Sequence, residues 1–247
     1  MKVEFAAVEA AVARLRERIA RAAARAGRNA EEIRLIAVTK TFGADAVRAA
    51  HEAGVRHFGE NWLQEWDAKR SELGTLEGAV FHMIGHLQRN KARRAAAIFD
   101  RVDSVDSVAL ARKLDHAAGE LGRKIPVLVE VRLSEEPAKT GIDPEVMEGL
   151  CEELSGLAHL TLEGLMTIPP WSEEAEASRP YFRRLRELRD LAAEHLGKPL
   201  PVLSMGMTTD FEIAIEEGAT EVRVGTAIFG KRTKPEPKEA DQTKEPL

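Results

Sequence analysis

Several features that mark particular classes of protein are nearly absent from this sequence of 247 residues. It holds one cysteine, Cys151, which excludes an internal disulfide framework and any metal site made of several cysteines. Cys151 falls in a segment expected to be helical, where a buried, inert thiol is the favoured interpretation. Positive charge is not in excess, because 36 Lys and Arg face 41 Asp and Glu. The resulting net charge of −5 argues against a general nucleic-acid binder.

Long apolar runs are missing as well. No stretch approaches the ~18 apolar residues that a membrane-spanning helix needs. Residues 1–12 form an amphipathic, partly acidic stretch that lacks the apolar centre of a signal peptide. We therefore expect a cytoplasmic protein without a membrane partner. A hydrophobic fraction of 44% is sufficient for a sizeable core and argues against disorder of the whole chain.

Two patterns alternate along the chain. Short apolar, β-branched runs predict strands at residues 34–40, 57–61, 80–84, 101–105, 125–131, 161–168, 202–205 and 221–224. Apolar residues at helical spacing predict helices at residues 5–26, 44–53, 62–73, 90–99, 107–121, 144–157, 173–196 and 210–217. Eight strands alternating with helices indicate a parallel sheet. Eight such units in a chain of this length favour an α/β fold, namely a single (β/α)8 TIM barrel with an extra N-terminal helix.

An open, doubly wound sheet is the competing architecture. It is disfavoured because no G-x-G-x-x-G turn follows the first predicted strand. We place one domain at residues 1–230. The tail, residues 231–247, is predicted to be disordered, because Pro235, Pro237 and Pro246 lie among mixed charges with almost nothing apolar.

Functional residues of such barrels lie at the C-terminal ends of the strands. The first predicted strand ends in Lys40, whose amine would be partly desolvated there. Desolvation lowers the pKa of an amine and suits it to Schiff-base formation. A lysine that merely extends to water is the alternative interpretation. The second predicted strand ends in Glu60 and Asn61, which could orient a ligand or cap the following helix.

The ends of the seventh and eighth strands have the composition of a phosphate site. Loops at these two positions are the recurrent phosphate binders of barrels. Gly206 and Gly225 allow close approach of the backbone to a ligand, and Ser204 and Thr226 supply hydroxyl groups. Helix capping by residues 208–210 is compatible with that role.

Arg223 lies between two valines of the eighth strand. If the valines pack against the outer helices, Arg223 points into the barrel, where its permanent charge requires a partner. Glu221, on the same face of the strand, could be that partner, and a ligand acid or ring nitrogen is the functional alternative. A lysine, a phosphate cradle and an arginine together fit pyridoxal 5′-phosphate (PLP), which carries an aldehyde, a phosphate and a pyridine nitrogen.

Other polar clusters give weaker signals. His82 and His86 are four residues apart, but they lie on a strand and a loop, and no third ligand is evident, so we predict no metal site. The basic run at residues 89–94 is typical of a solvated helix face, with anion binding left open.

Seven ordered motifs make the sequence resemble the pyridoxal phosphate homeostasis protein family from about residue 33 to 231. They are AVTK at 37–40, FGEN at 58–61, HMIGHLQRNK at 82–91, KTG at 139–141, GLM at 164–166, LSMGM at 203–207 and VRVGTAIFG at 222–230. The resemblance implies a barrel like the N-terminal domain of alanine racemase, with PLP held as a Schiff base on Lys40. It also implies phosphate binding by Ser204, Gly225 and Thr226, a pyridine nitrogen facing Arg223, and a pocket position for Asn61. Trp62 and Thr208 depart from the residues that are frequent in the family, and Trp62 is expected to change the rim of the pocket.

The resemblance implies a role in vitamin B6 homeostasis, in which PLP is buffered or delivered to apo-enzymes and amino-acid and keto-acid pools are balanced. A racemase-like enzyme is the alternative, but two-base chemistry needs a second proton carrier. The single tyrosine, Tyr181, lies in a helical segment where core packing is expected. From this length we expect no second domain of the kind that completes such racemases. We therefore expect a monomeric, non-catalytic PLP-binding protein. A cofactor-free lysine aldolase is a third possibility, which lacks the yellow absorbance of lysine-bound PLP.

Overall fold

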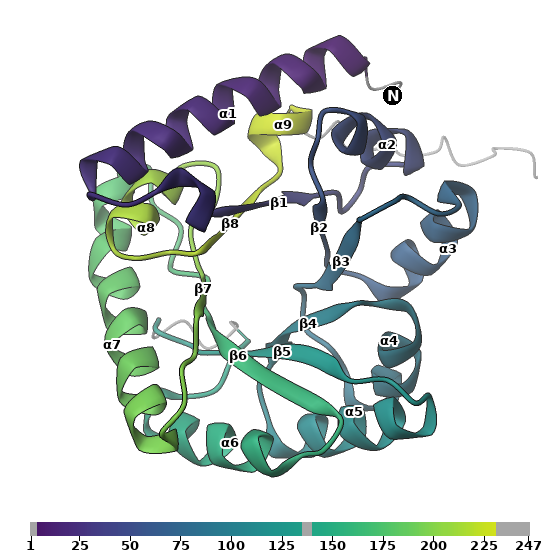
Figure 1. Cartoon of the computed structure of the whole chain (residues 1–247), viewed down its shortest axis with the longest axis vertical. Coiled ribbons are helices and arrows are strands. Elements are labelled where there is room, and N and C mark those ends of the chain that lie inside the picture. The colour runs from purple at the N-terminus through teal and green to yellow at the C-terminus, as the bar shows by residue number, and fades with distance from the viewer. Residues whose placement is uncertain (1–3, 135–139, 231–247) are drawn as a thin grey trace, which may run out of the picture.

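In the computed structural model, which describes residues 4–134 and 140–230, eight parallel strands close into a barrel in the order of the sequence (Figure 1). The strands are β1 (Arg34–Val38), β2 (His57–Glu60), β3 (Val80–Met83), β4 (Arg101–Val105), β5 (Ile125–Glu130), β6 (Leu160–Met166), β7 (Val202–Ser204) and β8 (Glu221–Val224). The predicted barrel is confirmed, and the predicted strands at 101–105 and 221–224 have the observed limits. The predicted disordered tail lies outside the described residues.

Helices surround the barrel, one after most strands. They are α1 (Phe5–Arg25), α2 (Ala44–Glu52), α3 (Leu63–Leu73), α4 (Ala92–Ile98), α5 (Val108–Glu120), α6 (Pro144–Gly156), α7 (Arg179–Leu196), α8 (Phe211–Glu216) and α9 (Thr226–Phe229), with short 3-10 turns η1 (Ala30–Glu32), η2 (Arg89–Lys91) and η3 (Ala175–Ser178). Two predicted helices, at 90–99 and 173–196, begin later than expected because a 3-10 turn precedes each. Pro180 in the first turn of α7 suits a helix start. The short α9 was not predicted.

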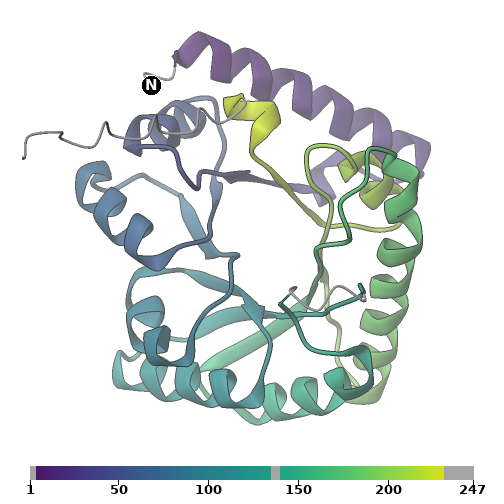
Figure 2. The same ribbon diagram turned by 180° about the vertical axis from the view of Figure 1, so that it is seen from behind.

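The N-terminal helix α1 lies on the side of the barrel where β8, the last strand, pairs with β1 (Figure 1). Its apolar residues Val8, Val12, Leu15 and Ile19 share one face and are buried. This face packs against α2, α8 and α9, and both views show α9 lying beside α1 (Figures 1 and 2). The expected extra helix therefore packs over α2, α8 and the four-residue α9.

The main hydrophobic core lies between the strands and the helices. Cys151 belongs to it, and burial raises the pKa of its thiol to about 12, as expected for an inert side chain. Tyr181, expected in the core, is only half-buried, because its neighbour Phe182 occupies the core-facing position of α7. None of the described helices combines the length and the apolar character needed to cross a bilayer.

Candidate functional site

A cavity of about 300 Å³ opens at the C-terminal ends of the strands. Its volume is at the lower end of the range for small-molecule sites. Five of the six residues predicted for the site line it, namely Lys40, Asn61, Arg223, Gly225 and Thr226. The closed barrel brings them together, because residues far apart in sequence sit at the same end of neighbouring strands.

Lys40 follows β1 by two residues and is half-buried in the cavity wall. The residue before it, Thr39, is fully buried, and its hydroxyl donates to Glu60 Oε1 at 2.6 Å. The residue after it, Thr41, has φ +70°, the one positive φ of a non-glycine residue in the described ranges. Such a conformation is strained for a β-branched residue and persists only when its surroundings hold it.

A buried lysine of α3 holds the backbone on both sides of Lys40. Lys69 Nζ donates to the Thr39 carbonyl at 2.9 Å, to Glu60 Oε1 at 2.6 Å and to Glu65 Oε1 at 3.2 Å. Glu65 Oε1 in turn accepts from the backbone N–H of Thr41 at 2.5 Å.

Burial raises the pKa of Glu60, although Lys69 and the Thr39 hydroxyl oppose the shift. Sequence reasoning named Glu60 as a possible ligand-orienting residue but missed its pairing with Lys69. The spacing of Glu65 and Lys69, four residues apart on a helix, was the available signal.

Asn61 presents an unsatisfied acceptor at the cavity. Its Oδ1 is buried and has no hydrogen-bond partner among the described residues, so a ligand donor there would complete it. The helix-capping alternative is not realised, since Trp62 is the N-cap of α3 and no side chain caps that helix. Gly85 packs against Asn61 from behind, where a Cβ would lie 2.4 Å from the Asn61 carbonyl oxygen.

Arg223 points into the barrel, while Val222 and Val224 pack in the outer core, as predicted. Its Nη1 donates to Ser204 Oγ and its Nη2 to the Thr167 carbonyl, each at 2.7 Å. Burial lowers the pKa of the guanidinium, against the attraction of nearby carboxylates such as Asp103.

The proposed partner Glu221 is engaged elsewhere, because its Oε1 accepts from Arg34 Nη1 at 2.5 Å. Ser204 is fully buried and is not among the described lining residues, so its hydroxyl supports Arg223 from below.

Two loops give the cavity a side rich in hydroxyl groups. Thr208 and Thr209 come from the loop after β7, and Thr226 follows Gly225 after β8. Gly206 adopts φ +91°, and a Cβ there would lie 2.9 Å from Phe211 Cα, so only glycine permits this turn. These hydroxyls, with exposed backbone groups, suit a phosphate.

Apolar side chains form the remaining wall. Four of them lie in loops, and the sequence analysis did not identify them as cavity residues: Phe42, Ile168, Trp171 and Met207. Trp171 is 74% exposed at the mouth. Trp62, expected at the rim, is exposed but does not line the cavity in the part of the chain that the structure describes.

A buried carboxyl lies near the cavity at the end of β5. Glu130 accepts from the Thr140 hydroxyl at 2.8 Å, while its second oxygen has no partner in the described ranges. Burial raises the pKa of Glu130, and the Arg223 guanidinium opposes that shift. The sequence analysis did not single out this residue.

The two histidines of the predicted weak metal motif point apart. His86 is exposed and lies 3.1 Å from Asp106, whereas His82 is buried in the barrel and lies 2.7 Å from Asp103 Oδ2. His82, Asp103 and Glu221 have ligand atoms within 4.8 Å of one another. Arg101 is 3.5 Å from Asp103 and 3.8 Å from Glu221, so a guanidinium already provides positive charge to this cluster.

Comparisons with known proteins agree with this geometry. Residues 11–233 match the family model described as alanine racemase, N-terminal domain. The chain is 41% identical over 221 residues to a pyridoxal phosphate homeostasis protein of Aquifex aeolicus, covering 90% of this chain and 96% of that one. A protein of the same name from Pseudomonas aeruginosa is 45% identical over 221 residues, covering 90% and 94%.

Solved structures are similar too. PipY of Synechococcus elongatus, solved with PLP bound, has a TM-score of 0.81 and 38% identity, with 90% of this chain and 100% of that chain covered. An alanine racemase of Clostridium difficile has a TM-score of 0.68 at 17% identity, covering 90% of this chain and 57% of that one, which is a likeness of fold alone.

Proposed function

Since the chain belongs to the pyridoxal phosphate homeostasis protein family, within the wider family of alanine racemase N-terminal domains, we propose that it binds PLP at the barrel mouth and serves vitamin B6 homeostasis. The observation that carries the proposal is the single cavity that gathers Lys40, Arg223 and the hydroxyl-rich loops. A relative with 38% identity that holds PLP supports it.

The residues of the cavity fit the three polar groups of PLP. When bound, PLP supplies an aldehyde that condenses with an amine. Lys40 is the amine in the wall, and Gly225, Thr226 and the two threonines after β7 are the donors for a phosphate. Arg223 is a donor that stays charged, so a pyridine nitrogen facing it would accept a hydrogen bond and remain unprotonated.

Neighbouring residues hold Arg223 and the backbone around Lys40 in position. Ser204 and the Thr167 carbonyl fix both ends of the Arg223 fork, and the Lys69 network fixes the backbone around Lys40. Apolar side chains such as Phe42 and Ile168 line the same cavity as the Lys40 amine. A pre-arranged site binds its ligand with less loss of conformational entropy.

We propose further that the bound cofactor has no dedicated reaction. Of the described residues that line the cavity, Lys40 and Arg223 are the only ionisable ones. Racemisation needs a second group that exchanges protons, and an arginine does not give up its proton at usable pH. Delivery of PLP to apo-enzymes, a cytoplasmic location and a monomeric state stay predictions of the sequence.

Reduction of the PLP complex with borohydride, followed by peptide mapping, tests the site. We expect one modified lysine, Lys40. Lys40→Ala should lose the yellow absorbance and keep its circular dichroism spectrum, while Lys198→Ala, a lysine after α7, should keep both. Modification of another lysine, or none, would contradict the assignment.

Two assays test the absence of a reaction and the delivery role. The PLP complex is incubated with amino acids, and turnover in the ordinary enzymatic range of ~1–1,000 s⁻¹ would overturn the non-catalytic proposal. In a separate assay, an apo-enzyme mixed with the complex should recover activity, and Lys40→Ala should restore none beyond the free PLP control.

A further inference from the structure

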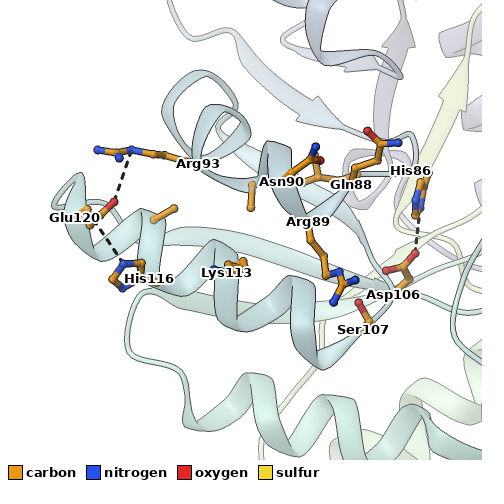
Figure 3. Close-up of a pocket in the computed structure, with 13 residues that line it drawn as sticks. His86, Gln88, Arg89, Asn90, Arg93, Asp106, Ser107, Lys113, His116 and Glu120 are labelled. Carbon is orange, nitrogen blue, oxygen red and sulfur yellow. Dashed lines mark hydrogen bonds and ion pairs between the residues drawn. The ribbon is translucent and has the colours of Figure 1, made fainter.

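A second and larger cavity, of about 900 Å³, lies between η2–α4 and α5 (Figure 3). We call it the α4–α5 groove. It opens at the loops after β3 and β4, on the end of the barrel that carries the PLP cavity. No residue lines both cavities within the described ranges, so the groove is a separate space.

The carboxylates of the groove are already paired at its two ends. Asp106 lies 3.1 Å from His86 Nδ1. At the other end Glu120 lies 3.6 Å from Arg93 and 3.5 Å from His116. The lining carries Arg89, Arg93 and Lys113 against these two carboxylates, so with neutral histidines it keeps an excess of one positive charge.

Two cations of the lining, Arg89 and Lys113, have no paired carboxylate within the described ranges. Figure 3 shows Arg89 extending from η2 toward the first turns of α5, where Lys113 also lies. Across residues 4–134 and 140–230 neither side chain has a hydrogen bond or an ion pair. The chain as a whole carries a net charge of −5, so this local excess of positive charge runs against its average.

We propose that the α4–α5 groove is a binding site for a phosphorylated small molecule of up to nucleotide size, with its phosphate held by Arg89 and Lys113. The guanidinium fork matches phosphate oxygens, and an ammonium adds a point charge. The hydroxyl of Ser107 and the amides of Gln88 and Asn90 line the same space and supply further polar contacts.

The volume and the charge of the groove indicate which class of ligand it binds. A volume of about 900 Å³ is near the upper limit of small-molecule sites and exceeds what inorganic phosphate needs. A long nucleic acid is disfavoured, because its affinity depends on many phosphate contacts, whereas here two cations are flanked by Asp106 and Glu120.

The groove adjoins the PLP cavity through one loop. Gly85 lies between them, packed against Asn61 on one side, and its carbonyl accepts from Ser104 Oγ at 2.6 Å. The proposal does not rest on PLP binding, however, because the groove has its own residues and its own opening.

Calorimetric titration of the full chain tests the site with ATP, AMP, PLP and inorganic phosphate as probes. It is run on the wild type and on Lys40→Ala, in which the first PLP site is removed. We expect at least one phosphate ester to bind one per chain in both proteins, more tightly than inorganic phosphate and more weakly as salt rises. Preference for ATP or AMP would identify a nucleotide, and preference for PLP would identify a second cofactor site.

A matched pair of double variants localises the binding. Arg89→Ala/Lys113→Ala should lower the affinity about tenfold or more, which is a loss of about 1.4 kcal/mol. Arg14→Ala/Lys198→Ala removes the same charge from α1 and from the end of α7 and should leave the affinity unchanged. Both should keep the yellow PLP band of the wild type. No ester binding at millimolar concentration, equal binding of inorganic phosphate, or equal affinities in the two variants would each overturn the proposal and leave PLP binding at Lys40 untouched.

Discussion

Lys69 Nζ donates to Glu60 Oε1 at 2.6 Å, in a place where both side chains are almost completely excluded from solvent. The same ammonium reaches the carbonyl of Thr39, the residue before Lys40. A buried ion pair therefore connects α3 to the end of β2, and the same ammonium holds the backbone after β1, where the proposed cofactor lysine lies.

Removal of the ammonium should destabilise the protein strongly. We expect Lys69→Met to lower the free energy of unfolding by about 3–5 kcal/mol, because the buried Glu60 loses its partner and must either stay charged and unpaired or take up a proton. Chemical denaturation measures the change. Lys69→Met/Glu60→Gln should recover part of the loss, because the amide oxygen still accepts from Thr39 while the charge is gone. A loss below about 1 kcal/mol, the range of exposed pairs, would show that the pair is not buried as observed.

Thr41 allows a test of the strain next to Lys40. Its φ of +70° costs a β-branched residue about 1–2 kcal/mol, and glycine, which adopts this region freely, loses about 0.5–1 kcal/mol more entropy on folding. Thr41→Gly should therefore raise the free energy of unfolding by up to about 1 kcal/mol. Thr41→Ala keeps the unfavourable Cβ and should not. If both variants are equally stable, the backbone there is not strained.

Much of the fold was predictable because backbone geometry imposes it. The hydrophobic periodicity of a strand or a helix can be read from one segment alone. Strands that alternate with helices can form only a few closed topologies. The site residues at strand ends followed from the same topology, since Lys40, Asn61 and Gly225 had to meet wherever eight strand ends converge.

The other features depend on how each helix is rotated about its axis and on how deep each side chain lies in the barrel. A sequence pattern encodes neither. Lys69 lies on the buried face of α3, and only the packing of that helix turns its ammonium toward Glu60. Ser204 was expected to donate its hydroxyl to a phosphate, but the stagger of the strands sets its depth, where it accepts from Arg223. Trp171 and Phe42 reach the cavity from irregular loops, whose paths depend on tertiary contacts.

The guanidinium shape of Arg223 should matter as well as its charge. A lysine has one nitrogen and does not reproduce a fork that donates to Ser204 Oγ and the Thr167 carbonyl together. We expect Arg223→Lys to lower the free energy of unfolding by about 1–3 kcal/mol, the cost of one unsatisfied buried group, and to weaken PLP binding. The surface control Arg184→Lys on α7 should stay within about 0.5 kcal/mol of the wild type. Equal effects of the two substitutions, measured by denaturation and PLP titration, would contradict the role of the fork.

His57 should make the stability depend on pH. Burial lowers the pKa of its ring to about 3, and the neighbouring His82, Arg34 and Arg101 add to the shift. In the unfolded chain a histidine titrates near ~6.5. Between these values the unfolded state binds a proton that the folded state does not, so stability falls as the pH falls from ~6.5 toward ~3.

The slope from this group is at most about 1.4 kcal/mol per pH unit, and smaller here because the ring is only half-buried. His57→Gln should flatten the dependence when the free energy of unfolding is measured from pH ~4.5 to ~7.5. The exposed control His116→Gln should keep the wild-type slope. A slope unchanged in His57→Gln would mean that the barrel accepts a charged ring beside its arginines, against the packing observed.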